Sequence, residues 1–294
     1  MEITNKLNLP DAVVRAVTNR PYSKGAADFS ATQLLGPPQI GQLMAEHGDS
    51  LTEDASDRFW ALLGSAMHVV LGWAAGNTNP EVASEVRLFG SIDIDGTPVT
   101  ISGSPDNVEI DRGLLSDYKI TSVWTAISGA RPEWEQQANI YKWLLAKNGT
   151  QVDRLQIIML FRDWSKTKAA REPGYPQAMI MPHQVMTWPL EVTEEFIRER
   201  IRLHRQSPTP ECTEEDRWFR GGQIAVMKKG NKRAVRLLDT VEEAEQYMDS
   251  KHLKRPEHYI DERPGENVRC ASYCPVASVC QQWAKLRGAD GNPL

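Results

Sequence analysis

Two aspartates and a lysine near the middle of the chain have the types and spacing of a divalent-cation site. These residues are Asp106, Asp117 and Lys119. If residues 111–112 form the tip of a two-residue hairpin, Asp106 lies opposite Asp117, with their Cβ atoms about 5 Å apart. A three-residue loop with a bulge at Gly113 would shift this register by one residue. In either register the two carboxylates converge.

The chemistry of this group follows from its charges. Strand alternation places Asp117 and Lys119 on one face, with Tyr118 pointing away. Two neighbouring carboxylates repel each other unless a cation bridges them, and oxygen ligands suit Mg²⁺ or Mn²⁺. Lys119 could neutralise charge on a phosphate or orient an attacking water. Taken alone, the Asp-x-Lys tripeptide is equally compatible with an exposed ion pair on a solvated hairpin.

The cysteines form a second group. Cys270, Cys274 and Cys280 lie within the last 25 residues, and Cys212 lies upstream. In a cytosolic chain such crowding favours metal binding over disulfides. Four thiolates suit either tetrahedral zinc or an iron-sulfur cluster, and the spacing does not choose between them. Four unrelated buried cysteines are the remaining interpretation.

The elements that would position these groups follow from periodicity and turn signals. We expect a helix over 28–47, broken at the Pro37-Pro38 pair, and an amphipathic helix over 53–75. The remaining expected elements are three or four strands within 82–120, a helix over 132–147, strands at 155–161 and 177–181, and a helix over 191–206. This order predicts a mixed α/β layer.

A smaller ββα unit is expected between Cys212 and Cys270. Strands over 224–228 and 234–238 flank a hairpin turn, and a helix opens at Thr240 with Glu243 at the capping-box spacing. The sequence therefore predicts two parts: an α/β core over 1–207 and, over 208–294, a ββα insert with a four-cysteine metal-cluster subdomain packed on the core.

Four short motifs resemble the RecB-like branch of the PD-(D/E)xK nucleases. They occur in the order of that family: Gly64-x3-His68, Gly103-x2-Asp106, Asp117-x-Lys119 and Gln137-x3-Tyr141. The resemblance implies a restriction-endonuclease-like mixed central sheet flanked by helices. It also implies a metal-dependent deoxyribonuclease that acts as an exonuclease on DNA, either single-stranded or with a free end.

The resemblance also implies roles for individual residues. The catalytic residues would be Asp106, Asp117, Lys119, Gln137 and Tyr141. The ligands of Mg²⁺ or Mn²⁺ would be His68, Asp106, Asp117 and the backbone carbonyl of Tyr118. Gln137 and Tyr141 share a helix face, and in the family such residues touch the DNA backbone and brace the active site. Glu85 could add a further carboxylate.

For the cysteines, the chain resembles the CRISPR-associated and AddB-type four-cysteine nucleases. That resemblance implies a 4Fe-4S cluster held by Cys212, Cys270, Cys274 and Cys280, with Zn²⁺ as the alternative. In those relatives the first cysteine precedes the nuclease motifs, whereas Cys212 follows them. The chain also resembles phage exonucleases, which suggests a role in recombination, replication or repair, possible partnership with a recombinase, and a bacterial host.

The net charge of −5 indicates that any DNA contact is local. The candidates are the arginines 198, 200, 202 and 205 and the basic run 228–236, for which solvated faces are an equal alternative. No apolar run approaches the roughly 20 residues of a membrane span, and no secretory signal opens the chain, so we expect a cytoplasmic protein without membrane contact.

Three rival functions remain open at this point. One is a non-catalytic DNA-binding or scaffold protein that retains the nuclease fold. Another is a nuclease that trims DNA ends in CRISPR integration. The third is a zinc-stabilised protein of unrelated function.

Overall fold

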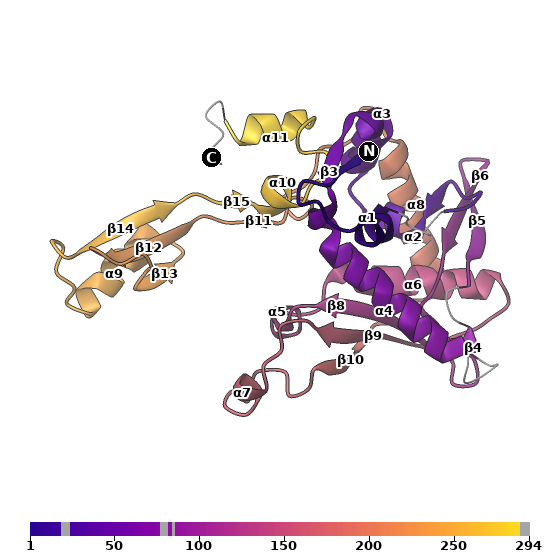
Figure 1. Ribbon diagram of the computed structural model, residues 1–294, viewed down its shortest axis with the longest axis horizontal. Helices are drawn as coiled ribbons and strands as arrows, with labels where there is room; N and C mark the ends of the chain where they lie inside the picture. Colours follow the sequence, from indigo (N-terminus) through magenta and orange to yellow (C-terminus); the bar gives the residue numbers. More distant parts are fainter. Residues whose placement is uncertain (19–23, 77–81, 84–85, 289–294) are drawn as a thin grey trace. The chain divides into compact units, whose positions relative to one another are not determined.

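The structure, a computed structural model, describes residues 1–18, 24–76, 82–83 and 86–288 (Figure 1). The chain divides into two units, Met1–Gly36 with Thr52–Pro208, and Pro37–Leu51 with Thr209–Leu294. The second unit takes in residues 37–51, which the division expected from the sequence assigns to the core.

A five-stranded sheet forms the centre of the first unit, in the order β10-β9-β8-β7-β4. Strands β8 and β9 are parallel, and the other neighbours are antiparallel. The five strands are β4 (Val82–Ala83), β7 (Asn107–Glu109), β8 (Leu114–Thr121), β9 (Arg154–Phe161) and β10 (Ile180–Val185). The mixed α/β fold expected from the sequence is therefore confirmed.

A second sheet in this unit has three strands, in the order β2-β6-β5. These strands are β2 (Phe29–Ser30), β5 (Leu88–Ile94) and β6 (Thr97–Gly103). The chain makes a tight turn between β5 and β6, where Asp95 and Gly96 both have positive φ. A short parallel pair, β1 (Glu2–Thr4) with β3 (Thr52–Asp54), lies near the N-terminus.

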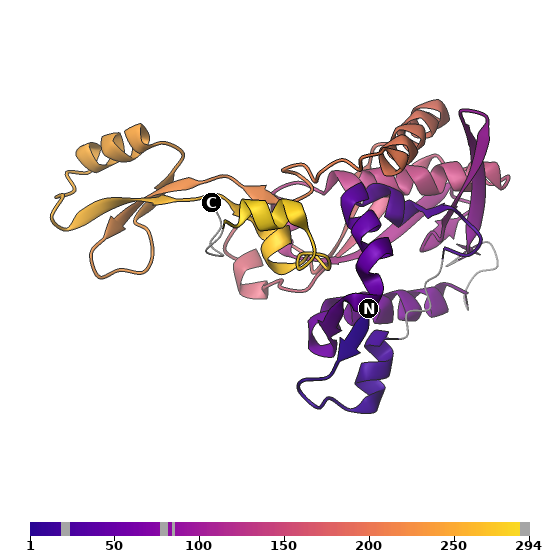
Figure 2. The same cartoon turned by 90° about the horizontal axis from the view of Figure 1, so that it is seen from above.

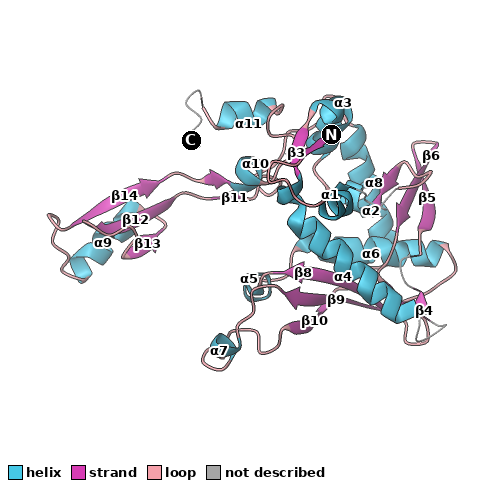
Figure 3. Cartoon of the chain, in the orientation of Figure 1, coloured by secondary structure: helices cyan, strands magenta, loops and turns pink. Residues whose placement is uncertain are grey.

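Helices lie alongside these sheets (Figures 2 and 3). They are α1 (Asp11–Thr18), α2 (Ala31–Leu35), η2 (Ala55–Arg58), α4 (Phe59–Gly76), α5 (Val123–Ile127), α6 (Pro132–Lys147), α7 (Lys166–Ala169) and α8 (Leu190–Arg205). The main core joins α6 and α8 to the strands, and its largest fully buried side chain is Trp143. None of the described helices is long and apolar enough to cross a membrane.

Helix α6 sits very close to the strands because two glycines face it. A Cβ added at Gly90 would lie 2.7 Å from Trp143, and one added at Gly103 would lie 2.7 Å from Tyr141. Real Cβ atoms do not approach neighbours this closely, so these positions favour glycine. The close approach matters for the site, because Gly103 lies three residues before Asp106.

Most elements agree with the sequence expectations, with some shifted bounds. The helix over 132–147 is confirmed as α6, and the expected break at Pro37 separates α2 from α3 (Pro38–His47). The helix expected to begin at residue 53 begins at Phe59, because β3 and η2 take the preceding residues. The strand expected over 177–181 lies at Ile180–Val185.

The apolar stripe of α4 does not form a buried face. Val69, Val70 and Trp73 are each more than half exposed, although their spacing predicts burial. The periodicity therefore identified the helix correctly, but tertiary contacts decide which side of it is covered.

The second unit contains a three-stranded sheet in the order β13-β12-β14. Its elements are α3, η1 (Gly48–Ser50), β11 (Phe219–Arg220), β12 (Gln223–Lys228), β13 (Arg236–Leu238), α9 (Val241–Ser250), β14 (His258–Arg263), β15 (Glu266–Asn267), α10 (Val268–Ser272) and α11 (Gln281–Leu286). The ββα order expected between the cysteines matches β12, β13 and α9. The strand β14, which pairs with β12, was not expected.

Candidate active site

The hairpin of β7 and β8 brings the two aspartates together. Its register pairs Asn107 with Ser116 and Val108 with Leu115, and one step further along the same register places Asp106 opposite Asp117. This is the register that the sequence predicts for a hairpin with residues 111–112 at its tip. Gly113 at the turn has φ +57°, a conformation that favours glycine.

Asp106 is held from two sides. Its Oδ2 accepts a hydrogen bond of 2.7 Å from the backbone N–H of Tyr118. Its Oδ1 lies 3.1 Å from Nδ1 of His68, which comes from α4. The rings of His68 and Tyr118 meet edge to face, with centroids 6.4 Å apart. The helix that carries the Gly-x3-His motif is thus joined directly to the hairpin.

Asp117 is a deeply buried carboxylate, only 1% exposed. Its Oδ2 lies 2.6 Å from Nζ of Lys119 in an ion pair. Neither of its carboxylate oxygens receives a hydrogen bond of good geometry from the described residues. Burial raises the pKa of Asp117 to about 6; the charge of Lys119 opposes this shift, and that of Asp106 adds to it.

Lys119 is the first member of a chain of hydrogen bonds that ends on α6. Its Nζ donates to Oε1 of Gln137 at 2.9 Å, and Nε2 of Gln137 donates to the hydroxyl of Tyr141 at 2.7 Å. The helix begins with Pro132 in its first turn, which pre-sets the helical φ. Because Gln137 and Tyr141 are four residues apart, they lie on the same face of the helix.

The residues expected from the four motifs are therefore brought together. Two contacts link the hairpin to helices that are distant in sequence: His68 with Asp106, and Lys119 with Gln137. The expected ligand role of the Tyr118 carbonyl remains a prediction. Glu85, the possible additional carboxylate, lies outside the described residues.

The donor set fits a divalent cation in its chemistry. Two cis ligands of an octahedral ion at about 2.1 Å are roughly 3 Å apart, which is close to the separation of Nδ1 of His68 and Oδ1 of Asp106. The carboxylate of Asp117 has unused acceptor capacity beside them. No three His, Cys, Asp or Glu side chains among the described residues are gathered closely enough to hold a metal ion. The ammonium group of Lys119 lies next to Asp117, where it supplies the positive charge that a metal ion would bring.

The arginines of α8 mostly serve the fold. Arg200 donates to the carbonyls of Leu34 and Gly36, both at 2.7 Å, and Arg198 donates to the carbonyl of Asp93. These contacts tie α8 to neighbouring elements of the first unit. Fewer arginines of this helix are therefore available for DNA contact than the sequence suggests.

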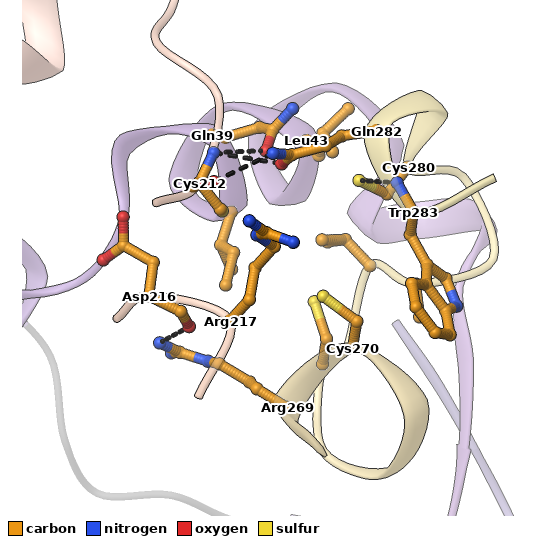
Figure 4. A pocket seen from close by; sticks show the side chains of 14 residues that line it. Gln39, Leu43, Cys212, Asp216, Arg217, Arg269, Cys270, Cys280, Gln282 and Trp283 are labelled. Atoms are coloured by element: carbon orange, nitrogen blue, oxygen red, sulfur yellow. Dashed lines mark hydrogen bonds between the residues drawn. The ribbon is translucent and has the colours of Figure 1, made fainter. Parts of the chain in front are cut away.

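The four cysteines line one cavity in the second unit (Figure 4). Burial raises the pKa of the Cys212 thiol to about 12, with Asp216 and the other three cysteines adding to the shift. Burial also raises the pKa values of Cys270 and Cys274. Thiols that are costly to ionise without a compensating positive charge, gathered in one cavity, are typical of a site for a metal or cluster.

Two glutamines that sequence reasoning missed hold this cavity together. The backbone N–H of Cys212 donates to Oε1 of Gln39 at 3.1 Å and to Oε1 of Gln282 at 3.0 Å. Nε2 of Gln282 donates back to the carbonyl of Cys212 at 2.8 Å. Gln39 belongs to α3, far from the cysteines in sequence, and no local signal marks it.

A profile of the PD-(D/E)XK nuclease superfamily matches residues 42–281 of the chain. Among solved structures, one titled "Crystal structure of SSO0001" is similar over 62% of this chain and 79% of that chain, with 16% sequence identity and a TM-score of 0.46. No curated protein matches the chain. The matched residues include all four motifs and all four cysteines.

Proposed function

Since the chain belongs to the PD-(D/E)XK nuclease superfamily, whose members are nucleases with DNA as the implied substrate, we propose that it is a divalent-metal-dependent DNA exonuclease. Its catalytic centre is formed by Asp106, Asp117 and Lys119. The observation that carries this proposal is the buried carboxylate of Asp117, which receives no well-formed hydrogen bond from the described residues and lies beside Asp106 and the ammonium group of Lys119.

The metal ligands in this proposal are His68, Asp106, Asp117 and the carbonyl of Tyr118. A bound Mg²⁺ or Mn²⁺ supplies Lewis-acid chemistry for phosphodiester hydrolysis. The 3.1 Å contact between His68 and Asp106 supports this ligand set, because both atoms can serve one ion. The hydrogen bond from Tyr118 fixes the other oxygen of Asp106 and thereby the direction of its carboxylate.

Lys119 has the role of charge stabilisation. Its ammonium group can orient a water molecule or neutralise charge that develops on a phosphate. Gln137 and Tyr141 act as positioning residues in this proposal, because their hydrogen bonds fix the ammonium group from α6. A fixed position lowers the reorganisation that the reaction requires.

An iron-sulfur cluster in the second unit is part of the proposal, with zinc as the alternative. Four thiolates suit either tetrahedral zinc or an iron-sulfur cluster. The described cysteines line a common cavity. The cluster is preferred because the four cysteines resemble those of the CRISPR-associated and AddB-type nucleases.

Exonuclease action and a role in phage-type recombination, replication or repair rest on the resemblance of the four motifs and the cysteines to RecB-like, CRISPR-associated and phage nucleases. The substrate in this proposal is DNA that is single-stranded or has a free end. The partner in this proposal is a recombinase.

Degradation of end-labelled oligonucleotides tests the proposal. Wild-type protein should degrade DNA with Mg²⁺ or Mn²⁺ and not with EDTA. Lys119→Ala should lower the rate by about 10²-fold or more, because it removes one fixed charge from the reacting phosphate. Asp111→Asn, at the exposed tip of the same hairpin, is the matched control. A wild-type protein that binds oligonucleotides without cutting them would instead establish the non-catalytic binder.

A further inference from the structure

An exposed tryptophan at the start of α4 carries a stacked arginine. The guanidinium of Arg162 lies 4.6 Å from the centroid of the Trp60 ring. Phe59 meets the same indole edge to face, with ring centroids 5.1 Å apart. Both aromatic side chains are more than half exposed, at 55% and 54%. The indole is thus oriented by its neighbours and still open to solvent.

This arrangement contributes little to the core. Neither Trp60 nor Phe59 belongs to a hydrophobic cluster of the described residues. The guanidinium of Arg162 has no carboxylate within ion-pair distance in the described part of the chain, although its charge is among the causes that lower the pKa of the adjacent Asp163. An exposed arginine on an exposed indole is the combination that proteins use to stack bases of single-stranded nucleic acid.

The pair lies at the end of the strand that carries the candidate catalytic residues. The backbone N–H of Arg162 donates to the carbonyl of Thr121 at 3.0 Å, and Thr121 lies two residues beyond Lys119 on β8. Trp60 lies eight residues before His68 on α4, which is about 12 Å along the helix axis. At about 3.4 Å per stacked nucleotide, this distance corresponds to a few nucleotides.

We propose that Trp60 and Arg162 form a platform that holds one unpaired nucleotide of the DNA strand a few positions from the scissile phosphate. The base stacks on the indole, and the guanidinium offsets the charge of an adjacent phosphate. This proposal rests on the proposed nuclease function and deepens it, because it selects a strand whose bases are unpaired. A base in a duplex is stacked on its neighbours and does not offer its face to an indole.

The net charge of the chain also supports local binding of a DNA strand at this platform. The chain has a net charge of −5, so a polyanion is not attracted to its surface in general. Binding must come from local groups, and the platform combines a local positive charge with an aromatic face. Stacking tolerates any base, so the platform sets the form of the strand and not its sequence.

Steady-state cleavage of a labelled single-stranded oligonucleotide and of the corresponding blunt duplex tests the platform. Trp60→Ala should raise KM for the single strand roughly tenfold and change kcat by less than about twofold, because stacking of a base is lost while the catalytic centre is intact. Trp60→Phe retains an aromatic face and should recover most of the affinity. Arg162→Ala should raise KM and reduce its dependence on salt.

A matched control is available on the same helix. Trp73 is 72% exposed, and it lies 13 residues after Trp60, which places it on nearly the opposite side of α4. Trp73→Ala should behave as wild type on both substrates. Circular dichroism checks that every variant is folded, and the rise in KM of Arg162→Ala serves as the test if Trp60→Ala does not fold.

Direct binding separates this proposal from the proposed function. With EDTA present to prevent cleavage, oligo(dT) should quench tryptophan fluorescence of the wild type, and most of the quenching should disappear in Trp60→Ala. If Trp60→Ala and Trp73→Ala have the same KM and the same fluorescence quenching, the platform is overturned, while the proposed nuclease function is unaffected. A protein that quenches but never cuts would overturn the proposed function and leave the platform in place.

Discussion

Asp117 shows the conflict between stability and chemistry at the scale of a single residue. Its carboxylate is buried, its oxygens receive no well-formed hydrogen bond from the described residues, and burial raises its pKa. A buried polar group without partners destabilises a fold. Such a group is typical of a functional site, where a ligand completes its interactions.

We therefore expect Asp117→Asn to stabilise the metal-free protein while it abolishes DNA degradation. Replacing the buried charge by a neutral group of similar shape should raise the free energy of unfolding by about 1–3 kcal/mol. Urea unfolding in EDTA measures this change, with Asp111→Asn as the control. An Asp117→Asn protein that is less stable than wild type would show that Lys119 compensates the carboxylate fully.

Glycines decide how closely α6 can approach the strands, which is a property of whole elements. Gly103 on β6 faces Tyr141 and Leu144, and a Cβ there would lie 2.7 Å and 2.8 Å from their ring and methyl carbons. Gly64 on α4 differs, because a Cβ at that position meets no atom within 4 Å. Of the two motif glycines, Gly103 is therefore required for the close packing of α6, whereas Gly64 has room for a side chain.

Substitution of alanine for Gly103 and for Gly64 should have opposite effects on stability. Gly103→Ala should destabilise the protein by about 1–3 kcal/mol, because α6 must shift to admit the methyl group. Gly64→Ala should stabilise it by up to about 1 kcal/mol, because alanine is the better helix former and meets no obstacle. Thermal unfolding of both variants measures the contrast. Equal effects would mean that backbone freedom, and not the approach of α6, governs Gly103.

Helices α6 and α8 are joined by a partly exposed network. Oε1 of Glu194 accepts a hydrogen bond of 3.0 Å from Nε1 of Trp143 and lies 2.8 Å from Nζ of Lys147. The bond to Lys147, followed by that to Trp143, lowers the pKa of Glu194. A carboxyl group with a lowered pKa stabilises the fold above its unfolded pKa, and this stabilisation is lost as the pH falls.

Glu194→Gln should therefore lower stability at pH 7 by up to about 1 kcal/mol, since the group is partly exposed. The difference from wild type should shrink as the pH falls below about 4.3, where the unfolded glutamate becomes protonated. Unfolding midpoints at several pH values measure it, with Glu195→Gln on the same helix as the control. A difference that is constant with pH would assign the effect to packing and not to charge.

At the scale of the whole molecule, the second unit has only a small hydrophobic cluster. Its hydrophobic cluster among the described residues contains three buried side chains, Val226, Ala244 and Met248. Small units with limited cores commonly depend on a metal or a covalent cross-link. The cysteine cavity joins α3, Cys212 and the segments after β15, which are separated in sequence.

We therefore expect the second unit to depend on the group that we propose its cysteines to bind. Protein purified without oxygen should absorb near about 400 nm and contain about four iron atoms per chain. Cys280→Ser should lose both signals and increase proteolysis within residues 209–294, whereas Ser272→Ala should not. A colourless protein with about one zinc per chain would contradict the cluster and favour the alternative.

The sequence by itself determined the features that depend on neighbouring residues. Strand alternation and a short turn set the register of Asp106 against Asp117, and helical spacing set the bounds of α6 and the shared face of Gln137 and Tyr141. These features are local, because a hairpin register or a helix face follows from a few consecutive dihedral angles.

Tertiary structure alone decided which distant elements meet. It joined His68 to Asp106, fixed Lys119 through Gln137 and left much of the apolar stripe of α4 exposed. It also brought Gln39 of α3 to Cys212 and stacked Arg162 on Trp60. Such contacts depend on how whole elements pack, and a local pattern contains no information about the partner that packing brings to each side chain.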